Sequence, residues 1–575
     1  DLQEIRDDVL LNLSLLERKD EDIYQLHPLI RKFMVGKLQQ FDSVEEWKRS
    51  FCQVLVEAAR KISENITLEK VQEVEVDIPH ITEVAEHLTE YLGDDDLIFP
   101  FTKLGSFYRE QGFYRQAEPW LDKGREIAEK QLGKDNPDVA TVYNGLALLY
   151  YSQGRYSEAE PLYQQAIEIV KIALPTNHRD IATHLNNLAL LYQSQGRYSE
   201  AEPLYQQAIE IVKIALPSNH PELARTLQNL ALLYNFQGKY EAAEPLYKQA
   251  IEIFKLALPA NHPYLASTFS NQAELYRYQG RYSEAELLYQ KAIEIANIAL
   301  PPNHPDIAIH LNNQAELYRY QGRYLEAEPL YQKAIEIAKI ALLANHPYLA
   351  TYLNNLTLLY ESQGRYSEAE PLLQQAIEIF KIALPANHPY LASIFNNQAN
   401  LYESQGRYSE AEPLYQQAIE IDKIALPANH PKLGIHLNNL ALLYYSQGRY
   451  SEAEPLLQQA IEINKIALPA NHPSLARDLN NLALLYESQG RYSEAEPLFQ
   501  QAIEIHKIAL PANHPSLATH LNNLAGLYKS QGRYSEAEPL YLQALDMFEQ
   551  TLGQEHPNTK IVRENVELCR QQQQS

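Results

Sequence analysis

Histidines recur at a fixed interval of 42 residues, and metal binding is the first chemistry to consider for them. They are His178, His220, His262, His304, His346, His388, His430, His472, His514 and His556. Equivalent positions in neighbouring units should stand about 10 Å apart, one helix spacing. A zinc ion binds nitrogen ligands at about 2 Å and cannot join two units. We therefore interpret each histidine as lying at or near a helix N-cap, and we predict no metal site.

Carboxylates also recur in every unit, as in Glu158 and Glu160, and paired carboxylates can serve as a general acid and base. A catalytic pair would not be copied ten times, and Ser199-x-x-Glu202 has the spacing of a helix capping box. No serine or cysteine lies in a nucleophile motif. The nearest match to a phosphate-binding loop, Val35–Leu38, lacks the upstream glycine and the hydroxyl. The sequence predicts neither an enzyme nor a cofactor.

Asparagines are the polar residues that helix geometry does not explain. They lie in the middle of a predicted helix, where Asn is a mediocre helix former. A side-chain amide donates and accepts hydrogen bonds at once, which suits contact with peptide backbone. The alternative is a hydrogen bond between units that only orders the stack, and both roles can hold together. These ladder asparagines are Asn187, Asn229, Asn271, Asn313, Asn355, Asn397, Asn439, Asn481 and Asn523.

Differences between units single out the third and fourth full units. Most units carry Leu three residues after the ladder asparagine, whereas these two carry Glu, followed by Arg-Tyr. Arg and Tyr are enriched where partners bind tightly, although neutral drift in a duplicated pair explains the same pattern. We predict that the arginines bind an acidic group of a partner, with internal pairing to the glutamates as the alternative. This central patch comprises Asn271, Glu274, Arg277, Tyr278, Asn313, Glu316, Arg319 and Tyr320.

The composition and net charge of the chain limit the classes of partner that it can bind. The chain has 575 residues, of which 45% are hydrophobic and 21% are charged, as in ordinary globular proteins. Its net charge of −25 argues against a bulk electrostatic grip on nucleic acid or anionic lipid. No apolar run approaches about 18 residues, and Cys52 and Cys569 are too few for a disulfide scaffold. We expect a cytoplasmic chain, cut from something longer because no signal-like segment follows Asp1.

Glycines define the repeat that must position the candidate residues. Eleven of them, from Gly112 to Gly532, stand 42 residues apart, and each lies in Gln-Gly-x-Tyr. Such a period is typical of solenoid repeats. Within one unit, Leu185, Leu188 and Ala189 follow helical spacing, and Gly196 supplies the left-handed residue that ends this first helix. A second helix follows, so we expect two helices per unit over residues 98–552.

The repeat resembles a known family. Its small and aromatic positions match the tetratricopeptide pattern, and the phrases NNLALLY, QGRYSEAEPLY and NHPxLA with a 42-residue period resemble kinesin light chains and bacterial proteins that share this repeat. The resemblance implies an all-α, right-handed superhelix of eleven helical hairpins. It also implies a concave groove that binds an extended protein or peptide segment, lined by the ladder asparagines. The matching positions are Ala189, Tyr192, Gly196, Tyr198, Ala201, Tyr205 and Ala208.

The segment before the repeats differs in kind. Ser14–Arg18 and Ile23–Leu26 read as two short strands, and the run YQLHPLIRKFMVGKL resembles the end of the winged-helix segment of NB-ARC-type (STAND) signalling ATPases. We therefore expect a winged-helix remnant and an amphipathic helix over residues 1–70 and a helical connector over 71–97. A capping helix and tail should occupy residues 553–575.

Two functions compete on this evidence. The first is the ligand-sensing arm of a signalling ATPase, with self-association through an upstream ATPase module. The second is a freestanding cargo or assembly adaptor of the kinesin-light-chain kind. Such adaptors carry a heptad coiled coil before the repeats, and residues 1–97 show none, which favours the sensor.

Overall fold

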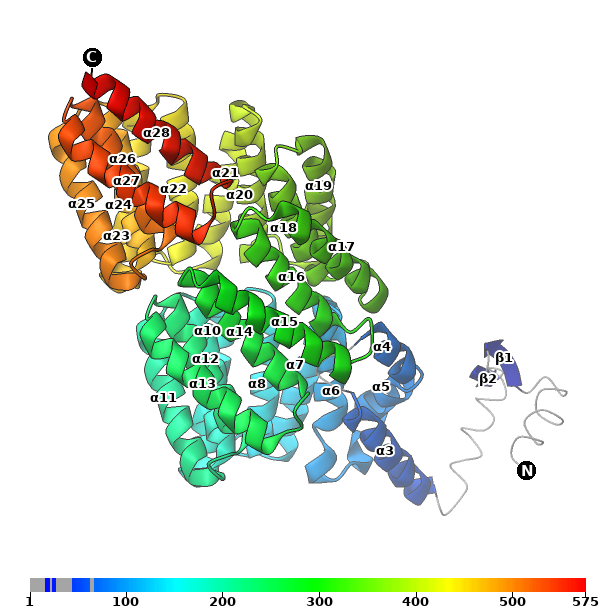
Figure 1. Cartoon of the computed structure of the whole chain (residues 1–575). Helices are drawn as coiled ribbons and strands as arrows, with labels where there is room; N and C mark the ends of the chain where they lie inside the picture. Colours follow the sequence, from blue (N-terminus) through cyan, green and yellow to red (C-terminus); the bar gives the residue numbers. More distant parts are fainter. Residues whose placement is uncertain (1–15, 21–22, 27–43, 63–66, 575) are drawn as a thin grey trace. The chain divides into compact units, whose positions relative to one another are not determined.

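The computed structural model describes residues 16–20, 23–26, 44–62 and 67–574 (Figure 1). The chain divides into two compact units. The first comprises Asp1–Ser63 and Glu73–Leu104, and the second comprises Glu64–Gln72 and Gly105–Ser575. The repeats lie in the second unit apart from the start of their first helix.

The first unit contains one β-hairpin and a small set of helices. Strands β1 (Leu16–Asp20) and β2 (Ile23–Leu26) pair antiparallel, with Leu16 opposite Leu26. The part of the YQLHPLIRKFMVGKL run that follows Leu26 lies outside the described residues. Helix α3 packs on α5 and buries Cys52 and Leu55. The helices of this unit are α3 (Val44–Arg60), α5 (Ile78–His87), η2 (Thr89–Tyr91) and η3 (Asp94–Asp96), and α4 (Leu68–Glu75) is divided between the two units at Gln72.

Within the described residues, eleven helical hairpins run from α6 to α27, followed by the capping helix α28 (Figure 1). The prediction of two helices per unit is confirmed. The bounds are α6 (Phe99–Glu110), α7 (Tyr114–Gln131), α8 (Pro137–Ser152), α9 (Tyr156–Ala173), α10 (Arg179–Ser194), α11 (Tyr198–Ala215), α12 (Pro221–Phe236), α13 (Tyr240–Ala257), α14 (Pro263–Tyr278), α15 (Tyr282–Ala299), α16 (Pro305–Tyr320), α17 (Tyr324–Ala341), α18 (Pro347–Ser362), α19 (Tyr366–Ala383), α20 (Pro389–Ser404), α21 (Tyr408–Ala425), α22 (Pro431–Ser446), α23 (Tyr450–Ala467), α24 (Pro473–Ser488), α25 (Tyr492–Ala509), α26 (Pro515–Ser530), α27 (Tyr534–Thr551) and α28 (Pro557–Gln574).

The ends of the first helix in each unit follow from two residue types. The imidazole of His220 lies at the N-cap of α12 and accepts a hydrogen bond from the backbone N–H of Glu222 at 3.2 Å. Gly238 ends the turn after this helix with φ of 67°, a conformation that costs glycine little. Both interpretations made from the sequence, the histidine N-cap and the left-handed glycine, are confirmed.

The capping-box interpretation of Ser199 and Glu202 is wrong. Arg197 occupies the N-cap of α11 without a side-chain cap, so Ser199 lies inside the helix. The carboxylates serve contacts between units instead, because Glu160 accepts hydrogen bonds from Arg197 at 2.7 Å and from Tyr192 at 3.0 Å. Tyr234 donates to Glu202 in the same way one unit later.

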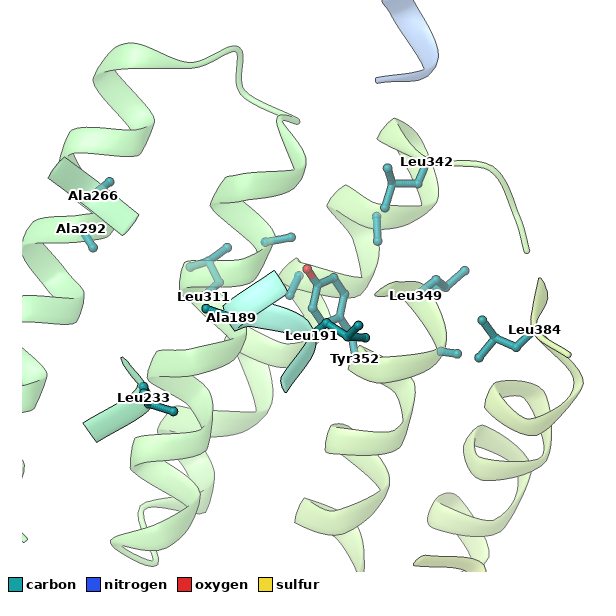
Figure 2. Close-up of a cluster of buried hydrophobic side chains, with 14 of the residues drawn as sticks. Ala189, Leu191, Leu233, Ala266, Ala292, Leu311, Leu342, Leu349, Tyr352 and Leu384 are labelled. Carbon is teal, nitrogen blue, oxygen red and sulfur yellow. The ribbon is translucent and has the colours of Figure 1, made fainter. Parts of the chain in front are cut away.

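The core of the repeats runs through successive units rather than filling one centre. Alanines such as Ala189 and Ala292 are fully buried and allow neighbouring helices to approach closely. Figure 2 shows part of one continuous cluster, with Leu191 of α10 and Tyr352 of α18 among its labelled side chains. Each unit contacts its neighbours along the chain, so most of the stability should be a sum over units and their interfaces. Contacts between units far apart in the sequence, such as His430 with Ser194, add to this sum.

Candidate functional site

The ladder asparagines bond to one another along the stack. In most units, the amide Nδ2 donates to the side-chain oxygen of the residue 43 positions earlier, as from Asn355 to Asn312 at 3.0 Å. The same bond joins Asn187 to Asn144, Asn229 to Asn186, Asn397 to Asn354, Asn439 to Asn396, Asn481 to Asn438 and Asn523 to Asn480. These side chains are half-buried. One N–H of each amide therefore orders the stack, and a second N–H remains.

Asn271 and Asn313 depart from this pattern. The residue 43 positions before Asn271 is Gln228, whose side-chain oxygen lies 2.6 Å from the hydroxyl of Thr268, and in the described residues no bond from Asn271 to Gln228 matches those of the other units. Asn313 donates to the hydroxyl of Ser270 at 3.3 Å, a longer contact than in the other units. The ladder is thus least engaged at α14 and α16, the helices that carry the central patch.

The arginines of the central patch pair internally. Arg277 binds Glu274 through two of its guanidinium nitrogens, Nε, which donates at 2.9 Å, and Nη2, and its side chain is only 10% exposed. Arg319 donates to Glu316 at 3.0 Å. Tyr289 donates to Glu274 at 2.8 Å from the second helix of the unit. The alternative foreseen from the sequence, neutralisation by the two glutamates, is the arrangement present.

Two tyrosines supply the exposed surface of the patch. The guanidinium of Arg277 lies 4.5 Å from the ring centre of Tyr278 and 4.4 Å from that of Tyr320, so one cation bridges rings of consecutive units. The two tyrosines are 40% and 47% exposed. Burial, followed by the charge of Glu274, raises the pKa of Tyr278, so its hydroxyl stays neutral.

Electrostatics hold the patch in its ionised form. Burial opposes ionisation of Glu274, but the charge of Arg277 and its hydrogen bond outweigh burial and hold the pKa of this carboxyl below its usual value. The same pairing raises the pKa of the Arg277 guanidinium against the effect of burial. The exposed surface of the patch is therefore aromatic and amide-rich.

A second set of contacts, which the sequence analysis missed, joins residues 236 positions apart. The ring Nε2 of His430, His472 and His514 lies 3.0, 3.1 and 3.2 Å from the carbonyl oxygens of Ser194, Phe236 and Tyr278. The start of a first helix in a late unit therefore rests on the Gln-Gly turn of an early unit. We call this contact between successive turns of the solenoid the seam.

Glycines of the early units make the seam possible. A Cβ atom added at Gly154 would lie 2.8 Å from Cδ of Pro389 and 3.0 Å from Cδ2 of His388. Equivalent contacts surround Gly196, Gly238, Gly280 and Gly322. No signal within one repeat could reveal this, because the partner of each glycine is set by the number of units per turn.

In the described part of the chain, no three His, Cys, Asp or Glu side chains come together as metal ligands. Over the same residues, no helix has the length and apolar character needed to cross a bilayer.

Comparisons with known proteins agree with this architecture. Tetratricopeptide repeat models match residues 99–172, 180–256, 306–382, 390–466 and 433–508, and a second such model matches 265–306 and 517–558. The search of curated proteins returned no match.

Two solved structures illustrate the likeness. The nearly identical TPR-like repeats assigned to a kinesin light chain of Podosopora anserina are 30% identical, with 36% of this chain and 98% of that chain covered and a TM-score of 0.31. BtubC (BKLC) from P. vanneervenii is 22% identical, with 45% and 95% covered and a TM-score of 0.33. Because the repeat models match more than half of its residues, this chain belongs to the tetratricopeptide repeat family.

Proposed function

We propose that the chain is a non-catalytic scaffold that binds an extended protein or peptide segment along the first helices of its units. The observation that carries this proposal is that the central patch combines an asparagine, Asn271, that lacks the usual bond to the preceding unit with the exposed rings of Tyr278 and Tyr320. Backbone groups of a ligand need donors and acceptors, and its side chains need apolar surface. This patch offers both on consecutive units.

The ladder asparagines would extend the contact in both directions. Each amide has two N–H groups, and the bond to the preceding unit uses one of them. The remaining N–H can donate to a peptide carbonyl without disturbing the stack. Affinity from such contacts is independent of ligand sequence, so selectivity would come from the central patch. In this proposal Arg277 and Arg319 chiefly fix the positions of the tyrosine rings. That the two arginines also bind an acidic group of the ligand stays a prediction.

Binding variants test this role. Candidate ligands are captured from the native cell and measured by isothermal titration. Tyr278→Ala with Tyr320→Ala should weaken binding by at least about 2 kcal/mol, as expected for aromatic anchors. The matched control is Tyr264→Ala with Tyr408→Ala, which removes two similarly exposed tyrosines outside both the patch and the seam. Equal affinity of both double variants would contradict the central patch.

The wider context is also a proposal. The run from Tyr24 to Leu38 supports a winged-helix remnant and thus the sensor arm of a cytoplasmic signalling ATPase, with self-association through that module. The alternative is an adaptor of the kinesin-light-chain kind. The gene upstream of Asp1 distinguishes them, since a Walker A loop supports the sensor and a heptad run supports the adaptor.

A further inference from the structure

The seam joins Gln-Gly turns of early units to histidine loops of late units, and it leaves the Gln-Gly turns of the late units and the histidine loops of the early units uncovered. The Gln-Gly turns of the early units are covered by the histidine loops of the late units, and Gly154 and Gly196 are buried. The equivalent turns of the late units are exposed, and a Cβ atom there would meet no described atom within 4 Å. We call these turns the free glycine edge. They contain Gly364, Gly406, Gly448, Gly490 and Gly532.

In the early units, the histidine loops are the uncovered surface that complements these turns. His178, His220 and His262 cap their helices as the late histidines do, through Nδ1. In the described residues, no carbonyl bond from their Nε2 atoms matches those of His430, His472 and His514. We call these three loops the free histidine edge. The two free edges have the same backbone geometry as the two halves of the seam.

Charges distinguish the free edges from the seam. Three residues before the glycine, the covered turns carry Arg109, Tyr151, Gln193, Asn235, Arg277 and Arg319, whereas the free turns carry Glu361, Glu403, Tyr445, Glu487 and Lys529. Two residues after the histidine, the loops that cover them carry Tyr348, Tyr390, Lys432, Ser474, Ser516 and Asn558. The loops of the free histidine edge carry Asp180, Glu222 and Tyr264.

Carboxylates are thus absent from these positions in the six covered turns and the six loops that cover them, and they are common on both free edges. The intervening His304 loop is the exception, because its Asp306 lines the cavity at the start of the seam. The contrast is informative because the units are otherwise nearly identical. The two positions border the seam, since Tyr151 and Tyr390 line the same cavity of about 320 Å³ between an early and a late unit. Carboxylates placed on both sides of such a contact would repel one another.

We propose that the free glycine edge of one copy and the free histidine edge of a second copy form a latent intermolecular seam, held apart by the carboxylates on both edges. A contact between two different surfaces of identical chains is open-ended and would build stacks rather than closed dimers. The carboxylates then act as charges on an exposed sheet edge do, keeping a self-complementary surface from associating.

A charge-swap cycle tests this inference by sedimentation velocity at neutral pH and low salt. Asp180→Lys with Glu222→Lys would place cations against Glu361 and Glu403 of the next copy. Lys432 and Lys529 already occupy equivalent positions, so the unit tolerates lysine at both. This variant should at least double its weight-average mass over a tenfold rise in concentration, whereas the wild-type chain should stay monomeric. Glu361→Lys, Glu403→Lys and Glu487→Lys should do the same from the other edge.

Combining the five substitutions places like charges on both edges again, and the chain should return to the monomer. Glu210→Lys with Glu252→Lys is the control, because it changes the net charge equally on exposed helix positions away from both edges. Monomeric single-edge variants with native circular dichroism would overturn the inference, as would association of the fivefold variant or of the wild type. If a lysine variant fails to fold, neutral Asn and Gln replacements at the same five positions should still associate, and a monomer there also overturns it.

Discussion

The Nε2 atom of His430 lies 3.0 Å from the carbonyl oxygen of Ser194, a residue 236 positions earlier. In the same ring, Nδ1 lies 3.0 Å from the backbone nitrogen of Lys432, whose N–H it accepts. A neutral imidazole that accepts at Nδ1 carries its proton at Nε2, so the two bonds together fix the tautomer. This histidine is therefore a helix cap and a link between turns at once.

Asparagine at the seam histidines should separate these two roles. Asn is a strong N-cap residue, but its side chain is shorter and would not reach the carbonyl of the other turn. We expect His430→Asn, His472→Asn and His514→Asn together to remove about 1 kcal/mol per bond from the free energy of unfolding. Amide hydrogen exchange near Gly196 and Gly238 should become faster, because these turns lose their cover.

The control for this variant is His178→Asn, His220→Asn and His262→Asn, at N-caps of the free histidine edge. These substitutions alter three helix caps of the same kind and leave the described seam intact. Equal losses of stability and equal exchange in both triple variants would show that the seam bonds contribute nothing.

Acid should weaken the seam. Burial lowers the pKa of His388 to about 3 and the pKa of His430, His472 and His514 to about 4. The unfolded value is about 6.5, so the folded state binds fewer protons. The contribution of these groups is therefore complete above about pH 6.5 and is lost progressively toward pH 4.

Thermal unfolding between pH 7.5 and pH 5 measures this dependence. The midpoint should fall more steeply with acid for the wild-type chain than for the seam triple Asn variant. A residual slope is expected in the variant, because burial also lowers the pKa of His184 and His310 to about 4. If the unfolding midpoint falls equally with pH in both proteins, the seam histidines do not cause the acid dependence.

The sequence predicts local structure well because each unit contains its own start and stop signals. His220 and Gly238 bound a helix by short-range hydrogen bonds and backbone preference, which act within one unit. The exception is Ser199, where serine and a carboxylate have capping-box spacing. There Arg197 occupies the N-cap, and the recurring glutamates pair between units.

The candidate site is less predictable because its contacts cross unit boundaries. The internal pairing of Arg277 with Glu274 follows from helical spacing and was foreseen as one alternative. The bridge from Arg277 to Tyr320 depends on how α14 and α16 pack. The contact of His430 with Ser194 depends further on the number of units per turn, a small rotation summed over several interfaces that no single repeat encodes.

Two glycines of equal backbone conformation should tolerate alanine differently. Gly154 and Gly406 have φ of 69° and 73°, so alanine should cost each turn a similar strain of roughly 1 kcal/mol. At Gly154 the new Cβ would also lie 2.8 Å from Pro389, whereas nothing described lies within 4 Å at Gly406. Chemical denaturation should therefore show a larger loss for Gly154→Ala, by about 1–3 kcal/mol of overpacking. Equal losses of stability in Gly154→Ala and Gly406→Ala would mean that the turn at Gly154 can move away from Pro389 at little cost.

A buried polar contact between units gives the last prediction. Oδ2 of Asp422 lies 2.7 Å from Nδ1 of His436, and the two side chains are 0% and 5% exposed. Asp422→Ala should destabilise the chain by about 1–3 kcal/mol, because the imidazole of His436 would stay buried without its polar partner.

The chain itself offers the compensating change. One unit earlier, Phe380 and Ile394 occupy the same two positions and are buried without polar atoms. Asp422→Phe with His436→Ile should therefore recover most of the wild-type free energy of unfolding, since replacing both partners of a buried polar contact by packed apolar residues can be nearly neutral or stabilising. Asp422→Phe alone should remain as unstable as Asp422→Ala, because the imidazole stays buried beside a ring. If Asp422→Phe is as stable as the double variant, the interface accepts an apolar residue beside His436, and the two side chains need not match each other. If both are unstable, the two interfaces differ in shape as well as in polarity.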